Sequence, residues 1–211
     1  TSRLMKVLTQ ARDEGIIPSF KGRLGDLGYI DKKYDAAIST NFAGRLKYLI
    51  VGKAEDATKV LNLLHKHNLA REHVFPLDRF HFDARLLAPA PPGKYPAPRL
   101  MDLIECDDEY RPAFYDALRN TIVANTSEEA TKFCKMPQCR QIAVATLQGN
   151  QFEGSGRATG GGNPRYGGIV TDRSKKAKTV TKEDKQAESH LAEKVEQLRR
   201  EAEELKKKEQ K

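Results

Sequence analysis

The last part of the chain repeats apolar residues at the spacing of a coiled coil. Between residues 173 and 211 there is no proline, glycine or aromatic residue, and charged residues fill most positions outside one apolar seam. Intervals of four, three, four and three residues separate the members of this seam, which is the heptad pattern of a helix that packs on a partner helix. A helix over 183–211 would be about 44 Å long. The seam consists of Leu191, Val195, Leu198, Ala202 and Leu205.

The beginning of the chain offers a partner for this helix. Leu4, Leu8 and Ala11 follow the same spacing before a glycine interrupts the pattern. A helix that is polar apart from a narrow seam needs a partner to be stable. We therefore expect coiled-coil helices over 1–14 and 173–211, paired antiparallel, with a folded domain inserted between them. A solvated single helix with fortuitous leucines is the alternative, because four intervals are a short sample.

The middle of the chain alternates short apolar runs with amphipathic stretches. Residues 48–51 form an apolar run typical of a buried strand, and 73–75 form a second one. Between them, apolar residues recur at the spacing of one helix face. Five prolines fall within 89–98, a density that excludes a helix or a central strand. We expect this segment to link two halves of the domain, 15–88 and 99–172.

The two halves share a sequence pattern. The stretch that begins at Leu49 aligns without gaps with the stretch that begins at Ile122, 73 residues later. The tripeptide Tyr-Asp-Ala precedes both stretches, at Tyr34 and again at Tyr115. Each half is thus predicted to contain helix, strand, helix and strand. We expect an α/β (α+β) fold of two similar subdomains, since two copies are too few for a solenoid.

Composition narrows the class of protein. The chain has 211 residues, with 37 Lys and Arg against 29 Asp and Glu, and a net charge of +8. Its apolar runs are far shorter than the about 20 residues of a membrane helix, so no membrane partner is expected. Three cysteines, an odd number, argue against a disulfide-stapled secreted scaffold and favour a reducing compartment. The sequence lacks G-x-x-x-x-G-K-[ST], so ATP hydrolysis within this chain is not expected.

Two of the cysteines, Cys134 and Cys139, are spaced like half of a zinc site. No second cysteine pair exists in the sequence, so we expect no metal centre. The internal repeat aligns Cys134 with Leu61. This alignment favours a small core residue instead of a metal ligand.

Glycine clusters are the strongest candidates for function. They lie at 22–28, at 154–156 and at 160–162. Glycine lets another backbone approach closely, and glycine-rich loops can also cradle phosphates. A dinucleotide fold places its glycines directly after the first strand and at the start of a helix, whereas the last two clusters lie near the end of the domain. Close packing at a subunit interface is therefore favoured, with a nucleotide-binding enzyme as the alternative of a different class.

Five ordered motifs resemble one known family. They run F-K-G-R-L-G-D-L-G from Phe20, Y-D-A-A-I from Tyr34, P-R-L-M-D-L from Pro98, A-F-Y-D-A-L from Ala113 with T-I-V-A from Thr121, and T-L-Q-G-N from Thr146 through S-G to T-G-G-G from Thr159. In that order and spacing the chain resembles the hinge domain of the structural maintenance of chromosomes (SMC) family over about residues 15–170. Within the family it is most similar to the larger SMC subunit of condensin, with cohesin subunits and the smaller condensin SMC subunit as alternatives.

The resemblance implies a dimerisation module without catalytic activity. SMC hinges join two SMC arms through sheet edges and glycines, and in eukaryotic complexes the two hinges come from different subunits. The implied partner is the hinge of the smaller condensin SMC subunit, or a second copy when the hinge is isolated. No cofactor is expected in this fragment, because the ATPase heads of the family lie outside it. Carried over by motif, the dimer contact would include Gly154, Gly156, Gly160, Gly161 and Gly162.

Basic residues gather towards the end of the domain, and the resemblance also implies DNA binding. Positive charge attracts phosphates, although a solvated helix start is the alternative interpretation. Single- and double-stranded DNA are not distinguished. The implied location is the chromosome in the nucleus, with the cytoplasm for part of the cell cycle. The candidate DNA-binding residues are Arg157, Arg165, Arg173, Lys175, Lys176, Lys178 and Lys182.

Overall fold

The computed structural model describes residues 2–174 of the chain. The chain divides into two units, Thr1–Thr171 and Asp172–Lys211, and the first unit is the folded domain. The helix expected over 173–211 lies almost wholly outside the described residues. The predicted residues that also lie outside them are Lys175, Lys176, Lys178, Lys182, Leu191, Val195, Leu198, Ala202 and Leu205.

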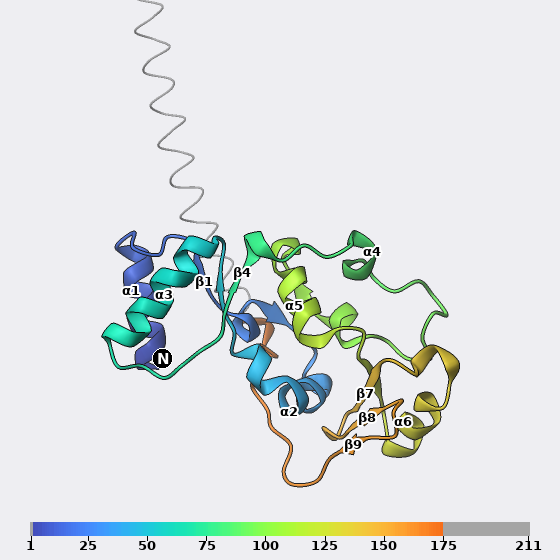
Figure 1. Cartoon of the computed structure of the whole chain (residues 1–211). Coiled ribbons are helices and arrows are strands. Elements are labelled where there is room, and N and C mark those ends of the chain that lie inside the picture. Colours follow the sequence, from blue (N-terminus) through green and yellow to red (C-terminus); the bar gives the residue numbers. More distant parts are fainter. Residues whose placement is uncertain (1, 175–211) are drawn as a thin grey trace, which may run out of the picture. The chain divides into compact units, whose positions relative to one another are not determined.

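The first half of the domain is built on a three-stranded sheet (Figure 1). Its elements are α1 (Arg3–Asp13), β1 (Phe20–Arg23), β2 (Gly28–Tyr29), α2 (Asp35–Leu46), β3 (Leu49–Val51), α3 (Ala54–Lys66), β4 (Val74–Pro76) and α4 (Ala84–Leu87). In the strand order β1-β3-β4, β1 runs antiparallel to β3, and β4 runs parallel to it. Because α3 connects the parallel pair, β3, α3 and β4 form a strand–helix–strand crossover.

The second half carries a four-stranded sheet, in the order β6-β7-β8-β9. Its elements are β5 (Glu105–Cys106), α5 (Arg111–Leu118), β6 (Ile122–Ala124), α6 (Ser127–Cys134), β7 (Ala143–Thr146), β8 (Gln151–Glu153) and β9 (Ala158–Thr159). The strands β6 and β7 are parallel, and β8 and β9 follow as antiparallel neighbours. A separate antiparallel pair, β2 with β5, joins the two halves.

The order helix, strand, helix, strand occurs twice, as α2-β3-α3-β4 and as α5-β6-α6-β7. The recurring sequence stretch supplies β3 with α3 in one half and β6 with α6 in the other. The second helices differ in length, with 13 residues in α3 and 8 in α6. Pro137 follows α6 closely, and proline disfavours helical backbone in the residue before it.

This difference corrects the interpretation of Cys134. Its counterpart Leu61 is 51% exposed on α3 and is not a core residue. Cys134 is the last residue of α6, and it lies half-buried at the margin of an apolar cluster. The thiol that is fully buried in this cluster is that of Cys139, because the turn after the shortened helix directs it inward.

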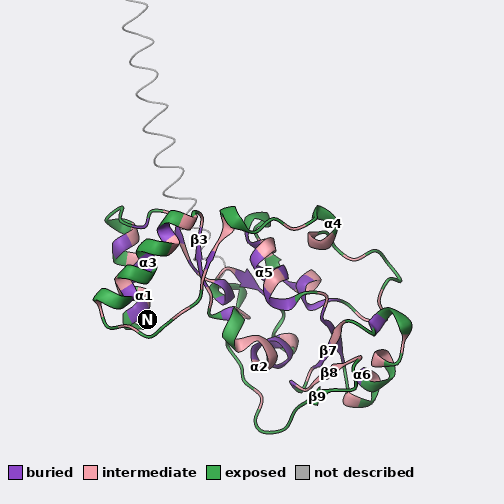
Figure 2. Ribbon diagram, viewed as in Figure 1, coloured by how far each residue is buried: buried purple, intermediate pink, exposed green. Residues whose placement is uncertain are grey.

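Successive side chains of a strand point to opposite faces of the sheet, so the second sheet contributes to two apolar clusters. Ile122 and Val144 belong to a cluster beneath α6, whereas their neighbours Val123 and Ala145 belong to a central cluster. The central cluster also contains residues of the first half, such as Ile50. Figure 2 shows buried residues on α2, α5, β3 and β7. The two repeats therefore share a central cluster, and each half also has a smaller apolar cluster beside it.

The apolar face of α1 packs within the first half. Leu8 is fully buried, and Leu4 and Ala11 are nearly so, in a cluster that includes Val60 and Leu64 of α3. The sequence indicated a coiled-coil partner for this face and did not indicate α3. The other half of the predicted seam lies outside the described residues, so the antiparallel coiled coil stays a prediction.

The proline-rich segment (89–98) has no helix or strand, as expected, and a buried arginine anchors it to the second half. Arg99 is 2% exposed and forms a bidentate pair with Asp102, at 2.8 and 2.7 Å. Its guanidinium also donates to the carbonyl oxygen of Leu86 and to Oδ1 of Asn120, at 3.2 and 3.0 Å. The backbone N–H of Ala90 also donates to Oδ2 of Asp102 at 3.1 Å, so the buried pair holds the beginning of the proline-rich segment on the second half.

Candidate functional site

One sheet of the second half ends in an exposed edge strand. β9 is the last strand in the order β6-β7-β8-β9, and both its residues, Ala158 and Thr159, are exposed. It pairs with β8 through Phe152↔Ala158 and Gln151↔Thr159. The glycines at 160–162 follow directly. An edge strand of small residues presents its backbone N–H and C=O groups to another chain.

The other edge strands of the two larger sheets carry features that hinder pairing with another strand. β1 carries an irregularity between Phe20 and Gly22, where its register with β3 shifts. β4 ends in Pro76, which has no N–H to donate, and β6 is bridged on its outer side by the pair Arg99↔Ile122. Bulges, prolines and covering segments are the usual devices that keep an edge from pairing. Within the described sheets β1-β3-β4 and β6-β7-β8-β9, β9 is the edge that has none of them.

The glycines at 160–162 are required for two different reasons. A Cβ atom at Gly160 would overlap the amide oxygen Oδ1 of Asn150, so the asparagine occupies the space of a side chain. Gly161 and Gly162 have φ of 89° and 71°, a conformation that favours glycine. A Cβ atom at either position would meet no atom of the described residues within 4 Å. The surface beside these two glycines is therefore open.

The other two glycines predicted at the dimer contact shape the hairpin between β8 and β9. A Cβ atom at Gly154 would overlap the backbone of Arg140, so close packing within the chain requires glycine there. Gly156 has a φ of 88° and donates its backbone N–H to the carbonyl oxygen of Glu153 at 2.9 Å. The fold of the hairpin explains both positions, and their role in a dimer contact stays a prediction.

Helix α2 holds the segment that follows these glycines. The backbone N–H of Arg165 donates to Oγ1 of Thr40 at 2.9 Å, and the Thr40 hydroxyl donates to the Arg165 carbonyl oxygen at 3.4 Å. Both carboxylate oxygens of Asp35 accept from the backbone N–H of Gly167, at 3.0 and 3.1 Å. The path of the chain after β9 is thus fixed at its far end by side chains of the first half.

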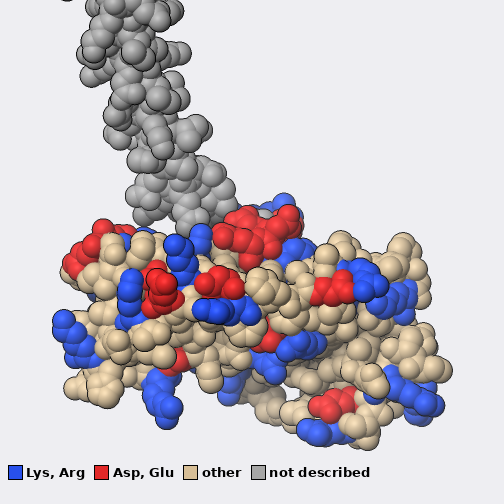
Figure 3. Space-filling model, turned by 45° about the horizontal axis from the view of Figure 1, so that its top comes forward, with Lys and Arg blue, Asp and Glu red and all other residues tan. Residues whose placement is uncertain are grey.

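The described candidate DNA-binding residues come from three separate segments. Arg157 lies in the turn between β8 and β9, where its guanidinium is 3.6 Å from the Glu153 carboxylate. Arg165 follows the glycines, and Arg173 lies beyond the end of the first unit; all three are exposed. On the face in Figure 3, basic and acidic side chains are interspersed over the described residues. That face shows no continuous basic field.

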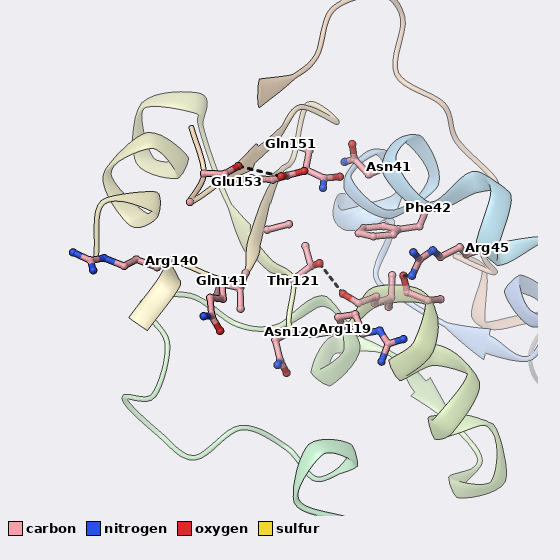
Figure 4. Close-up of a pocket in the computed structure, with 16 residues that line it drawn as sticks. Asn41, Phe42, Arg45, Arg119, Asn120, Thr121, Arg140, Gln141, Gln151 and Glu153 are labelled. Atoms are coloured by element: carbon pink, nitrogen blue, oxygen red, sulfur yellow. Dashed lines mark hydrogen bonds between the residues drawn. The ribbon is translucent and has the colours of Figure 1, made fainter. Parts of the chain in front are cut away.

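A cleft of about 470 Å³ lies between α2, the end of α5 and β8 (Figure 4). Phe42 lines it together with three arginines. Arg45 donates to the backbone carbonyl oxygens of Asp116 and Ala117 at the end of α5, at 2.7 and 3.1 Å. Arg119 pairs with the Asp116 carboxylate at 2.7 Å, and the side chain of Arg140 points away from Phe42 in Figure 4. Arg45 and Arg119 therefore bond to groups at the end of α5, and Arg140 faces outward. None of the three arginines is directed at a ligand in the cleft.

Residues 2–174 give little support for a metal site, a membrane span, a reactive thiol or a dinucleotide site. No three His, Cys, Asp or Glu side chains among them lie close enough together to hold a metal ion, and no helix among them is long and apolar enough to cross a membrane. Burial raises the pKa of the Cys134 thiol, and burial together with Cys134 raises the pKa of Cys139. A neutral thiol is a weak nucleophile and metal ligand. The glycines at 160–162 follow a late strand and do not directly open a described helix, unlike the glycines of a dinucleotide site.

Comparison with known proteins decides the family. The model of the SMC proteins' flexible hinge domain matches residues 17–134, which is more than half of the chain. The chain belongs to the SMC hinge family. The match ends before the β8–β9 hairpin, so the assignment rests on the first half and on α5, β6 and α6.

Curated relatives of this SMC hinge extend the similarity over nearly the whole chain. Structural maintenance of chromosomes protein 4 of Caenorhabditis elegans is 51% identical over 204 residues, which are 97% of this chain and 13% of that protein. The mouse protein of the same name is 37% identical over 193 residues, 89% of this chain and 15% of that protein. The chromosome condensation protein dpy-27 of C. elegans is 34% identical, over 84% of this chain and 12% of that protein. The hinge chain thus spans 13% of the length of the first relative.

Solved hinges have the same fold. An asymmetric dimer of the Geobacillus stearothermophilus SMC hinge domain matches with a TM-score of 0.66 and 22% identity, over 90% of this chain and 76% of that chain. The Pyrococcus furiosus SMC hinge domain matches with a TM-score of 0.54 and 25% identity, over 80% of this chain and 92% of that chain. The mixed helix-and-strand fold of an SMC hinge, predicted from the sequence, is confirmed.

Three structural residues of this hinge were missed by reasoning from the sequence. Asp35 and Arg99 stand in motifs that carried the family resemblance, so the signal was present without a role. Asn150 closes the T-L-Q-G-N motif and so also stands in one of them, but its contact with Gly160 depends on the pairing of β8 with β9. A contact across a hairpin cannot be read from spacing when the strands are only two or three residues long.

Proposed function

We propose that this chain is the hinge dimerisation module of a condensin-type SMC subunit, which it joins to a partner SMC subunit. The observation that carries the proposal is the β9 edge, which is exposed, built of small residues and continued by Gly161 and Gly162. A partner strand along β9 would gain main-chain hydrogen bonds, and the open surface of the glycines would let its backbone approach closely. The dimer of the Geobacillus hinge and the names of the curated relatives support this function.

The partner that we propose is the hinge of the smaller SMC subunit of condensin. A second copy of this chain is the alternative occupant of the edge, because homologous hinges present similar surfaces. The chain itself is assigned no catalytic step and no cofactor. Its full-length protein would act on chromosomes in the nucleus during condensation and segregation, and reside in the cytoplasm for part of the cell cycle.

Light scattering after gel filtration tests the partner. The chain is measured alone and mixed with the hinge of the smaller condensin SMC subunit. We expect a 1:1 heterodimer in the mixture. A stable homodimer that ignores the added hinge would overturn the choice of partner and keep the dimerisation. A monomer in both samples would contradict dimerisation itself.

Two glycine variants test the surface. Gly161→Val and Gly162→Val should each weaken association by more than about tenfold, because a branched side chain would stand between the two backbones. Gly93→Val is the matched control, since Gly93 also has a positive φ of 79° and open space for a Cβ atom but lies in the proline-rich segment. Wild-type affinity in all three variants would show that partner contact does not use the β9 edge.

Contact with DNA is a second proposed function. Its support is the net charge of +8 and the exposure of Arg157, Arg165 and Arg173. Alanine at these three positions should weaken binding and lower the slope of log affinity against log salt by about one for each phosphate contact removed. Single- and double-stranded oligonucleotides of equal length would reveal any preference. Binding that does not change with salt concentration would contradict a phosphate contact.

A further inference from the structure

We infer that Asn150 is a positioning residue for the dimer contact, because its amide sets the path of Gly160, Gly161 and Gly162 where they leave β9. Asn150 belongs to the turn between β7 and β8 and not to the glycine segment itself. The inference rests on the proposed function and gives a role to a residue of the T-L-Q-G-N motif, to which the motif alone assigned none.

The backbone of Asn150 is held rigidly. Its N–H donates to the hydroxyl oxygen of Thr146 at 3.1 Å, and its carbonyl oxygen accepts from the N–H of Thr146 at 2.8 Å. Thr146 is fully buried, and its own carbonyl oxygen accepts from the N–H of Gly149 at 2.9 Å. The side chain of Asn150 thus projects from a fixed point on the core.

The amide of Asn150 lies between two segments. Its Nδ2 donates to the hydroxyl oxygen of Ser127, at the start of α6, at 3.3 Å. Its Oδ1 fills the place that a Cβ atom of residue 160 would take, with Cγ 3.0 Å from the same point. One side of the amide is therefore tied to α6, and the other side supports the chain as it leaves β9.

The next two glycines have no comparable support. A Cβ atom at Gly161 or Gly162 would touch no described atom within 4 Å, and the next hydrogen bonds to the core involve Arg165 and Thr40. The segment is thus fixed by Asn150 at its beginning and by Thr40 at its end. If the amide were removed, the start of the segment would be free to move, and a partner strand would have to order it on binding.

A neighbouring side chain separates this role from a general stabilisation of the turn. Gln148 lies in the same turn, and its Nε2 donates to the carbonyl oxygen of Asn125 at 3.1 Å. Gln148 is exposed, and the three atoms nearest to a Cβ atom at Gly160 all belong to Asn150. Gln148→Ala therefore removes a hydrogen bond of the same kind without touching the glycine segment.

The test compares association affinity with the hinge of the smaller condensin SMC subunit. Asn150→Ala should weaken association about tenfold, because the partner strand would then have to order the glycine segment on binding, while its melting temperature stays close to that of Gln148→Ala. Gln148→Ala should bind as the wild type does. Asn150→Asp should also retain most of the affinity, since a carboxylate oxygen can take the place of Oδ1 and accept a hydrogen bond from the Ser127 hydroxyl.

A double variant tests the contact itself. Gly160→Ala should weaken association strongly, because the added methyl group overlaps the Asn150 amide. In Asn150→Ala/Gly160→Ala the obstacle is gone, so the loss should be smaller than the product of the two single losses. Wild-type affinity of Asn150→Ala, or strictly multiplicative losses, would overturn the inference. If Gly161→Val also bound as the wild type does, the proposed dimer surface would fail as well, so the two failures are distinguishable.

Discussion

The carboxylate of Asp35 accepts two hydrogen bonds from the backbone N–H of Gly167, 132 residues further along the chain, at 3.0 and 3.1 Å. Asp35 is the first residue of α2 and is 5% exposed, and its Oδ1 also accepts from the Ser39 hydroxyl at 2.6 Å. Since α2 belongs to the first half and Gly167 follows the second sheet, this contact ties the end of the domain to its beginning. The Tyr-Asp-Ala motif in front of α2 thus has a structural reason.

Asp35→Asn should destabilise the domain by about 1–3 kcal/mol, because the amide replaces the charged acceptor of the Gly167 N–H and the Ser39 hydroxyl and places an NH2 group where a carboxylate oxygen accepted. The matched control is Asp116→Asn, at the same motif position in the second half. Asp116 pairs with Arg119, whose side chain is 54% exposed, so its loss should change stability by less than about 1 kcal/mol. Urea unfolding monitored by circular dichroism measures both. Equal losses in the two variants would contradict the role given to Asp35.

Arg99, the residue directly after the proline-rich segment (89–98), should be very sensitive to substitution. Arg99→Met removes a buried cation that bonds Asp102, Asn120 and backbone carbonyls, so we expect a loss of about 3–5 kcal/mol, the range for one partner of a buried pair. Arg99→Lys should recover little of the lost stability, because an ammonium group cannot reproduce the bidentate geometry of the pair with Asp102. Arg85→Met is the control: the pair of Arg85 with Asp83 has side chains 90% and 44% exposed. A loss in Arg99→Met no larger than in this control would contradict the anchoring role.

Local patterns predicted the elements of the domain well, for a physical reason. The apolar run at 48–51 contains β3, and the run at 73–75 overlaps β4 (Val74–Pro76). β3 is the central strand of its sheet and is buried at all of its residues, so its sequence is apolar throughout. The repeat predicted the order of helices and strands in both halves, since each copy must bury the same helix face on the same kind of strand. The prolines of 89–98 excluded regular structure there, as observed.

The partner of each buried face could not be predicted in the same way. The spacing of Leu4, Leu8 and Ala11 indicates a buried helix face but does not say what covers it, and α3 contributes to that cover. A Cβ atom at Gly25 would overlap the carbonyl oxygen of Gly168, and a Cβ atom at Gly28 would overlap the ring of Phe114. Their motif suggested close packing at an interface, whereas both pack within the chain. Such contacts join residues that are far apart in sequence, and only the fold brings them together.

Asp56 should make the stability of the domain depend on pH. Burial raises the pKa of Asp56, but hydrogen bonds from the Ser19 hydroxyl and N–H and from Lys59 outweigh this effect and hold the pKa below its ordinary value. The three donor–acceptor distances are 2.7, 3.0 and 3.0 Å. A carboxyl group with a lowered pKa binds its proton more tightly in the unfolded chain. Its stabilising effect is therefore complete above the unfolded pKa of about 4 and is lost as the pH falls through the folded pKa.

The comparison of wild type with Asp56→Asn from pH 7 to pH 3 checks this sign. At pH 7 the variant should be less stable, because its amide replaces an acceptor of three hydrogen bonds. The difference in unfolding free energy should narrow below about pH 4, where the Asp56 carboxyl group of the unfolded chain takes up its proton, and should go on narrowing as the pH falls through the lowered pKa of the folded state. Two curves that stay parallel down to pH 3 would show that Asp56 is not responsible for acid sensitivity.

The last prediction separates the two possible partners of α1. Leu8 is fully buried in the cluster that contains Val60 and Leu64, so Leu8→Ala should destabilise the chain by about 2–5 kcal/mol. Lys6→Ala, on the exposed side of α1, should change stability by less than about 0.5 kcal/mol. Both variants are measured by urea unfolding in the full chain and in a chain that ends at residue 174. If Leu8 packs on α3 and the first sheet, Leu8→Ala should lower the unfolding free energy equally in the full chain and in the shortened chain, since both retain every contact of Leu8. If the seam at 191–205 were the principal partner of Leu8, the shortened chain would already lack that contact. Leu8→Ala would then lower the unfolding free energy of the shortened chain much less than that of the full chain.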